Sequence, residues 1–353
     1  MAKYTKQKSG LYRTKVLMGY GSDGKPVNKY LSARSIRELD ELVMRAKQDQ
    51  AQGLLLANNA AFGDYAKKWL SVYKANRGVA TRSMYEGIIK NHIDLLARVP
   101  LKDINRLMIQ GQINARADRP RTCEMILLTV KQILKSAIRD GLILRDPCID
   151  IELPRHVKKE KRALTDAEKS ALSSAILNPQ ERLLLLLLYG TGCRPAEIYA
   201  LTKSDLDFSA GVVNVNKSVQ FKNGVPVSED APKTDASVRS VIVSEAILRA
   251  IRHQLDKIPT ERIIASNSGD LMRKDGYERL FRSILRKAGL RDSGITMYTF
   301  RHNFCTECYY NGISLKECQR QMGHANYKMI LEVYSHLDSK KEQTAAKMSL
   351  MAI

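Results

Sequence analysis

The stretch RDPCIDIELPRHVKKEKR, residues 145–162, constrains the fold of this chain more than any other feature. Pro147 and Pro154 interrupt the helical pattern that precedes them, because proline cannot donate the backbone hydrogen bond of a helix interior. The chain of 353 residues also exceeds the usual size of a single domain. We therefore expect separately folded domains on either side of a basic linker over residues 151–163.

The charge balance predicts a polyanionic partner. Lysine and arginine total 58 against 37 acidic residues, a net charge of +21. A solvated basic surface is the alternative, but the cations gather in two places, the N-terminus and the linker. The candidate DNA contacts are therefore Lys3, Lys6, Lys8, Arg13 and Lys15, with Arg155, Lys158, Lys159, Lys161 and Arg162.

The cysteines and the apolar runs indicate the cellular compartment and argue against a membrane protein. Six cysteines are scattered without the spacing of a disulfide framework, and no signal peptide precedes them. The longest apolar run, LLLLLLYG at 183–190, is too short to span a bilayer and predicts a buried helix. We expect a cytoplasmic, nucleoid-associated protein rather than a membrane protein.

Residues 1–53 predict a small basic domain. Two β-rich runs within residues 9–32 flank Asp23-Gly24, a strong turn dipeptide, and indicate a hairpin. Ser35 and Glu38 then form a capping box at the start of a helix. This segment carries 11 lysines and arginines against 5 acids, which favours a nucleic-acid reader over an ordinary edge domain.

The rest of the chain divides at the linker. Residues 62–150 have helical periodicity, with helices expected at 62–76, 81–96, 101–115 and 120–140. Beyond the linker, Thr165 and Glu168 form another capping box, and a buried helix at 179–190 follows. Short strands are expected at 211–219 and 238–243, and helices from about 245 to the end.

Five short motifs carry chemistry when they are taken together. Breaking a phosphodiester without water or metal requires a nucleophile, cations on the non-bridging oxygens and an acid for the leaving oxygen. Tyrosine suits the nucleophile role, and planar arginines suit the phosphate. The motifs are GCRPAEI with Arg194, PKTDAS with Lys233, YTFRHNF with Arg301, MGHA with His324 and EVYSHL with Tyr334.

In this order the motifs resemble the tyrosine recombinases of the phage integrase family, which share their catalytic core with type IB topoisomerases. The resemblance covers residues 164–340 by motif and the whole chain in outline. It implies an α+β multidomain fold: a mainly helical catalytic domain with a small antiparallel sheet at 164–353, a helical core-binding domain at 62–150, and a small three-stranded arm-binding domain at 1–53.

The resemblance also implies a role for each residue. Arg194 and Arg301 bind the phosphate, and Glu197 supports them. Lys233 protonates the 5′-oxygen that leaves, and His324 donates a hydrogen bond to the phosphate. Tyr334 attacks phosphorus and forms a 3′-phosphotyrosyl link, with no cofactor.

One position departs from the family pattern. A histidine usually stands three residues before the second arginine, and this chain has Tyr298 there. A phenol can share a hydrogen bond with the phosphate but is a poor base near neutral pH. Tyr298 therefore predicts either a slower enzyme or a larger role for His324, and only Tyr334 has the nucleophile context. His302 and His336 are expected to have no catalytic role.

Metal chemistry is disfavoured. Cys305 and Cys308 form a C-x-x-C motif, but they lack the second pair that zinc requires, so we expect them to be buried. Asp205 and Asp207 are the one suggestive carboxylate pair for a metal-dependent nuclease. They fit better as the turn into the first strand of the catalytic domain.

The function implied is site-specific recombination for integration and excision of a phage or a conjugative transposon. Its partners would be double-stranded DNA at core and arm sites, three further copies in a tetramer, and an accessory bending or excision factor. The tail KKEQTAAKMSLMAI, residues 340–353, either docks on a neighbouring protomer or frays. A relaxing topoisomerase is disfavoured by the arm domain, and a DNA-binding regulator with an inactive site is disfavoured by the intact motifs.

Overall fold

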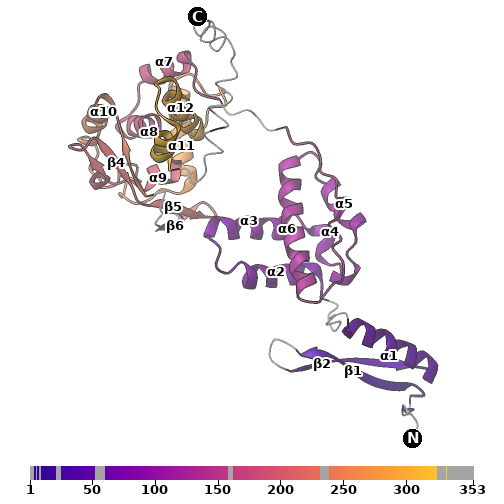
Figure 1. Cartoon of the computed structure of the whole chain (residues 1–353). Coiled ribbons are helices and arrows are strands. Elements are labelled where there is room, and N and C mark those ends of the chain that lie inside the picture. Colours follow the sequence, from indigo (N-terminus) through magenta and orange to yellow (C-terminus); the bar gives the residue numbers. More distant parts are fainter. Residues whose placement is uncertain are drawn as a thin grey trace, which may run out of the picture. The chain divides into compact units, whose positions relative to one another are not determined.

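A computed structural model of the chain describes residues 4, 6, 7, 9–20, 25–51, 60–157, 162–230, 238–323 and 331. The chain separates into two compact units, Met1–Lys158 and Lys159–Ile353. Helices dominate both units, and the sheets are small and antiparallel, which confirms the predicted α+β multidomain class (Figure 1). None of the described helices has the length and apolar character needed to cross a membrane.

The N-terminal segment forms a hairpin and a helix, as its turn and capping signals predict. Strands β1 (Tyr12–Tyr20) and β2 (Pro26–Ala33) pair antiparallel, and helix α1 (Ile36–Ala51) follows. Val16, Met18 and Ala46 are buried between the sheet and the helix. The resemblance predicts a third strand, but among the described residues Lys6 and Tyr12 form only an isolated bridge.

The second part of the first unit is helical. It contains α2 (Phe62–Tyr73), α3 (Val79–Asn91), α4 (Asp94–Ala97), α5 (Arg106–Asn114) and α6 (Pro120–Arg139). Trp69 lies at the centre of the core, where its ring meets that of Tyr85 edge-on at 5.2 Å. Its indole N–H donates to Ser136 Oγ at 3.0 Å, so this buried polar group is satisfied.

Two predicted helices of this unit are shorter than expected. The segment predicted as 81–96 ends at Asn91 and resumes as the short α4. The segment predicted as 101–115 begins with a 3₁₀ turn, Leu101–Asp103, and only then continues as α5. Asn105 causes this break, because its side chain accepts a hydrogen bond from the Met108 N–H at 3.1 Å and so caps a new helix.

The first residues after this helical core lie along its helices. Gln110 on α5 donates to the carbonyl oxygen of Glu152 at 3.0 Å and accepts from its N–H at 2.9 Å. Arg106 donates to the carbonyl oxygen of Asp150 at 2.7 Å, and the His156 ring lies 3.0 Å from Glu124 on α6. Residues 150–156 are thereby held on α5 and α6.

The second unit is built around helix α8 (Pro179–Thr191). Four of its leucines are fully buried, and it contacts α10 (Glu245–Leu255), α11 (Lys274–Lys287) and α12 (Met297–Tyr310). The predicted buried helix is therefore confirmed. The remaining helices are α7 (Asp166–Ser174), α9 (Pro195–Ala200) and α13 (Leu315–Met322).

Two small sheets flank these helices. Strands β3 (Leu206–Asp207), β4 (Val212–Val215) and β7 (Arg239–Ile242) form one sheet in that order. Strands β5 (Ser218–Lys222) and β6 (Val225–Asp230) form a separate hairpin. The single strand predicted at 211–219 is therefore two strands, β4 and β5, that belong to different sheets.

Candidate active site

Arg194 stands where α8 ends and α9 begins. Gly192 ends α8 with a left-handed backbone (φ 58°), which reverses the chain, and Pro195 opens α9. Glu197 lies one turn along α9. It accepts a hydrogen bond from the Arg194 backbone N–H at 2.8 Å and another from the Arg194 guanidinium at 2.7 Å. The local sequence GCRPAEI therefore builds an arginine with its own carboxylate support.

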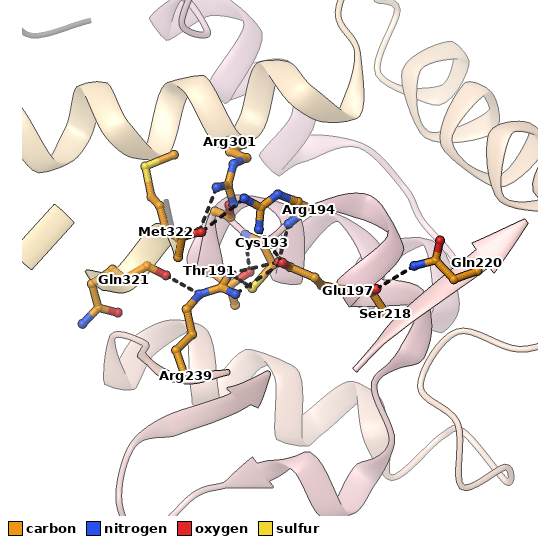
Figure 2. Close-up of polar contacts among 12 residues, drawn as sticks. Thr191, Cys193, Arg194, Glu197, Ser218, Gln220, Arg239, Arg301, Gln321 and Met322 are labelled. Atoms are coloured by element: carbon orange, nitrogen blue, oxygen red, sulfur yellow. Dashed lines mark hydrogen bonds and ion pairs between the residues drawn. The ribbon is translucent and has the colours of Figure 1, made fainter. Parts of the chain in front are cut away.

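Arg301 reaches the same place from α12. Its side chain is buried, and its two terminal nitrogens donate to the carbonyl oxygens of Gly192 and Met322, both at 2.8 Å. Arg194 donates to the carbonyl oxygen of Gly323, the residue that follows Met322 at the end of α13, at 3.2 Å. The end of α8 and the end of α13 therefore hold the two guanidinium groups together (Figure 2).

A third arginine, Arg239, completes the cluster, and the sequence patterns did not identify it. It is the first residue of β7, with a side chain that is 4% exposed. Its guanidinium donates to Glu197 Oε2 at 2.9 Å and to the Gln321 carbonyl oxygen at 2.8 Å. The signal was present, because strand alternation in VRSVIV puts Arg239 on the same inward face as Val241.

The Glu197 carboxylate lies close to three arginines: it accepts hydrogen bonds from Arg194 and Arg239, and its charge also acts on Arg301. Burial raises the pKa of Glu197, but the hydrogen bond and charge of Arg239, together with Arg194, outweigh burial and hold that pKa below its usual value. Burial and the nearby charge of Arg194 lower the pKa of Arg301 to about 10, so Arg301 remains charged at neutral pH. The cluster thus has a surplus of positive charge.

This surplus suits a bound phosphate. Each guanidinium has five N–H donors, and the protein contacts above use only some of those of Arg194 and Arg301. Arg194 retains 35% exposure of its side chain, so its outer edge is available to a ligand. Two adjacent planar cations of this kind can bind the non-bridging oxygens of a phosphodiester and its more negative transition state.

The other predicted catalytic residues lie near the cluster or outside the described residues. Tyr298 is in the first turn of α12, on the side of Arg301, and is 62% exposed. Lys233, His324 and Tyr334 lie outside the described residues. Their neighbours in the chain are described: Gly323, which bonds Arg194, precedes His324, and Arg239 follows the segment that contains Lys233.

The candidate DNA contacts fall into three groups. Lys6, Arg13, Lys15 and Arg155 are described and exposed, and Arg13 and Lys15 lie on the face of β1 opposite Val16. Arg162 is engaged by protein, since its guanidinium makes two bonds of 2.6 Å to Glu168 and holds the pKa of that carboxyl down at about 2. The residues outside the described part of the chain are Lys3, Lys8, Lys158, Lys159 and Lys161.

The C-x-x-C cysteines pack in the core, and the two aspartates accept hydrogen bonds in turns. Cys305 and Cys308 are buried, as predicted, and pack with Cys318 and Met322 between α12 and α13. Asp205 accepts hydrogen bonds from Thr202 and pairs with Lys217 at 2.9 Å. Asp207 accepts from the N–H groups of the turn that leads into β4. Asp205 thus shapes the 3₁₀ turn Lys203–Asp205 before β3, and Asp207 shapes the turn between β3 and β4.

Comparison with known proteins gives a consistent picture. The phage integrase family model matches residues 158–341, and the model of the phage integrase N-terminal SAM-like domain matches residues 61–115. A tyrosine recombinase XerC-like protein of Caldanaerobacter subterraneus is 22% identical over 98% of this chain and 97% of its own length. Tyrosine recombinase XerD of Pseudomonas putida is 25% identical over 76% of this chain and 89% of its own.

Solved structures share the fold. The Tn1549 transposon integrase, in complex with a circular intermediate DNA, superposes with a TM-score of 0.71 at 22% identity and covers 83% of this chain and 99% of its own. Lambda integrase, in a tetramer bound to a Holliday junction, gives a TM-score of 0.59 at 20% identity and covers 94% of each chain.

Proposed function

The chain belongs to the phage integrase family of tyrosine recombinases, enzymes that break and rejoin DNA strands, and we propose that it integrates and excises a mobile element. One observation carries this proposal: Arg194 and Arg301 converge from α9 and α12, with Glu197 buried between cations. A regulator that only binds DNA has no need of such a cluster. An inactive descendant would be free to lose it, because two like charges held in close proximity destabilise a fold.

The reaction proceeds in two transfers. The Tyr334 hydroxyl gives up its proton to solvent, and its Oη bonds to phosphorus while the bond from phosphorus to the 5′-oxygen breaks and Lys233 gives that oxygen a proton. Arg194 and Arg301 bind the non-bridging oxygens, and His324 donates a third hydrogen bond. A 5′-hydroxyl of the other strand then attacks the phosphotyrosyl bond and displaces Tyr334, so no external energy is used.

The remaining parts of the chain supply DNA contacts. We assign residues 62–150 to the core site and residues 1–53 to separate arm sites, with the exposed cations Lys6, Arg13 and Lys15 on the arm DNA. The Tn1549 integrase and lambda integrase, whose folds this chain shares, are complexed with a circular intermediate DNA and a Holliday junction respectively. We infer that this enzyme acts as a tetramer on such junctions, in the cytoplasm and on the nucleoid.

Covalent trapping tests this function. The purified chain is mixed with supercoiled plasmid that carries the joined ends of its element, in EDTA, and the reaction is stopped with detergent. We expect a protein joined to the 3′ side of the break, with Tyr334 as the modified residue in the digested peptide. An adduct that requires magnesium, or DNA binding without any adduct, contradicts the proposal.

Arg301→Lys is expected to lower the rate of strand cleavage by about 10²–10³-fold, the loss typical of one removed donor at a developing anion. Lysine has one compact ammonium, so it cannot bond the carbonyl oxygens of Gly192 and Met322 and also present a planar pair of donors to phosphate. The measurement is single-turnover cleavage of a nicked core site at saturating enzyme.

The matched control is Arg249→Lys on α10, where the arginine is 74% exposed. This variant should cleave at the wild-type rate. Unchanged cleavage by Arg301→Lys would show that Arg301 does not bind the phosphate.

A further inference from the structure

Three consecutive carbonyl oxygens at the end of α13 accept hydrogen bonds from the three clustered arginines (Figure 2). The pairs are Arg239 with Gln321 at 2.8 Å, Arg301 with Met322 at 2.8 Å and Arg194 with Gly323 at 3.2 Å. The C-terminal end of a helix carries a partial negative charge, which suits cations. The three guanidinium groups therefore meet at one place, although they come from β7, α12 and the start of α9.

Arg239 is far more enclosed than Arg194. Its side chain is 4% exposed, whereas that of Arg194 is 35% exposed. Gly323 packs against Arg239, because a Cβ at this glycine would lie 3.0 Å from the guanidinium nitrogen Nη1. Arg239 is therefore placed to act on groups of the protein, while the outer edge of Arg194 is placed to meet a phosphate.

The Glu197 carboxylate is shared between these two arginines. Its Oε2 accepts from Arg239 Nη2 at 2.9 Å and from the Arg194 backbone N–H at 2.8 Å. Its Oε1 accepts from the Arg194 guanidinium at 2.7 Å and from Arg239 Nη1 at 3.3 Å. One carboxylate can neutralise one guanidinium. Since two guanidinium groups share this carboxylate, Arg194 keeps positive charge that Glu197 would cancel if it bonded Arg194 alone.

The charge of this cluster matches that of the reacting phosphate. In the described part of the chain, one carboxylate among three guanidinium groups leaves a surplus of two positive charges, because Arg301 also remains charged at neutral pH. A phosphodiester carries one negative charge, and the addition of a phenolate to phosphorus brings a second. Without Arg239 the surplus would be one, which matches bound DNA but not the transition state.

We propose that Arg239 is a positioning residue that supplies the counter-charge of Glu197, so that the charge of Arg194 stays available to the phosphate. This inference rests on the proposed function, because it assigns the phosphate to Arg194 and Arg301. The effect of Arg239 then falls on the rate of strand cleavage, and the affinity for core-site DNA stays within a few-fold of wild type.

A double-mutant cycle between Arg239 and Glu197 tests this inference. The readout is single-turnover formation of the covalent adduct at saturating enzyme, and the rate constant comes from the time course, so it does not depend on the folded fraction. We expect Arg239→Met to cleave about 10²-fold more slowly than wild type, the loss typical of one stabilising group removed from a developing anion. Arg239→Lys keeps the charge and should have a rate between these two.

Removal of the Glu197 charge should restore part of the cleavage rate of Arg239→Met. In this variant the carboxylate is left to Arg194, and Glu197→Gln removes the charge that cancels the arginine. The double variant should therefore cleave about 10-fold faster than Arg239→Met, whereas two independent defects would make it slower still.

The matched control is an exposed pair on α10. Arg249 and Glu245 lie 3.7 Å apart, with side chains that are 74% and 84% exposed. Arg249→Met, Glu245→Gln and their double variant should all cleave at the wild-type rate, because an exposed pair far from any phosphate contact changes no charge at the site.

Each other outcome overturns the inference in a distinguishable way. If the double variant is no faster than Arg239→Met, Arg239 does not act through the charge of Glu197. If Arg239→Met weakens DNA binding as much as it slows cleavage, Arg239 supports the DNA-binding surface instead. If Arg239→Met cleaves at the wild-type rate, Arg194 needs no such support. If wild type forms no adduct, the proposed function itself is wrong and the inference fails with it.

Discussion

Tyr334→Phe is expected to abolish the covalent protein–DNA adduct and all strand exchange, while binding to the core site stays within a few-fold of wild type. Phenylalanine keeps the aromatic ring and loses only the oxygen that bonds phosphorus. Attack by water leaves no link between protein and DNA, so the adduct reports a nucleophile of the protein. The measurement is the fraction of labelled core-site DNA that migrates with protein in detergent.

A second tyrosine near Arg301, Tyr298, provides a matched control. Tyr298 is the second residue of α12, three positions before Arg301, and is 62% exposed. Tyr298→Phe removes the same single oxygen. We expect this variant to form the adduct, more slowly by up to about 10-fold, which is below the 10²–10⁴-fold that a full acid or base contributes.

The pair of variants assigns the nucleophile without further assumptions. An adduct that persists in Tyr334→Phe and is absent in Tyr298→Phe would exchange the two roles. An ionised tyrosine is present in only about one molecule in a thousand at neutral pH. Since Arg301 retains its charge there, the cations at the site favour the phenolate form of whichever tyrosine attacks.

The sequence predicted those parts of the site that depend on local patterns. Arg194 and Glu197 were identified through the resemblance of GCRPAEI to the family motif. The structure explains their spacing, because Glu197 lies three positions after Arg194 and the first turn of α9 brings its carboxylate back to the arginine. The buried helix and its end at Gly192 were also predictable, from an apolar run followed by glycines. Such features are decided by neighbours in the chain.

Features that depend on distant contacts were missed. Arg239 was only one arginine among many, since its partner Glu197 lies 42 residues away. For Arg162, the basic run did not indicate the two bonds that its guanidinium makes to Glu168, which also caps α7, and its contact with DNA stays a prediction. Charge alone predicts a cation's preference for anions, and only the fold decides which anion is nearest.

Glu197→Gln is expected to destabilise the second unit by about 3–5 kcal/mol, the cost of removing one partner from a buried ion pair. Glutamine has nearly the same shape, so the change isolates the charge. It leaves Arg239, whose side chain is 4% exposed, beside Arg194 and Arg301 without the carboxylate that these arginines share in the described part of the chain. Close cations that lose a shared counter-charge repel one another more strongly.

The measurement must report this unit alone. The chain has a single tryptophan, Trp69, in the core of the helical part of the first unit, so its fluorescence reports the wrong unit and should not change. Hydrogen exchange of the α8 and α12 amides in the full chain gives the opening free energy of the second unit. The matched control is Glu245→Gln on α10, where the carboxylate is 84% exposed and pairs with Arg249, and its effect should stay within about 0.5 kcal/mol.

The stabilisation of the second unit by Glu197 should depend on pH, in a direction set by the pKa of this carboxyl. The pKa of Glu197 is lower in the folded protein than the value of about 4.3 expected when unfolded, so its ionised form stabilises the fold above that value. This stabilisation is lost as the pH falls through the folded pKa, because protonation then removes the charge that Arg239 requires. The difference between wild type and Glu197→Gln should therefore be largest at neutral pH and should shrink in acid. A difference that stays constant down to low pH would mean that shape, rather than charge, makes Glu197 necessary.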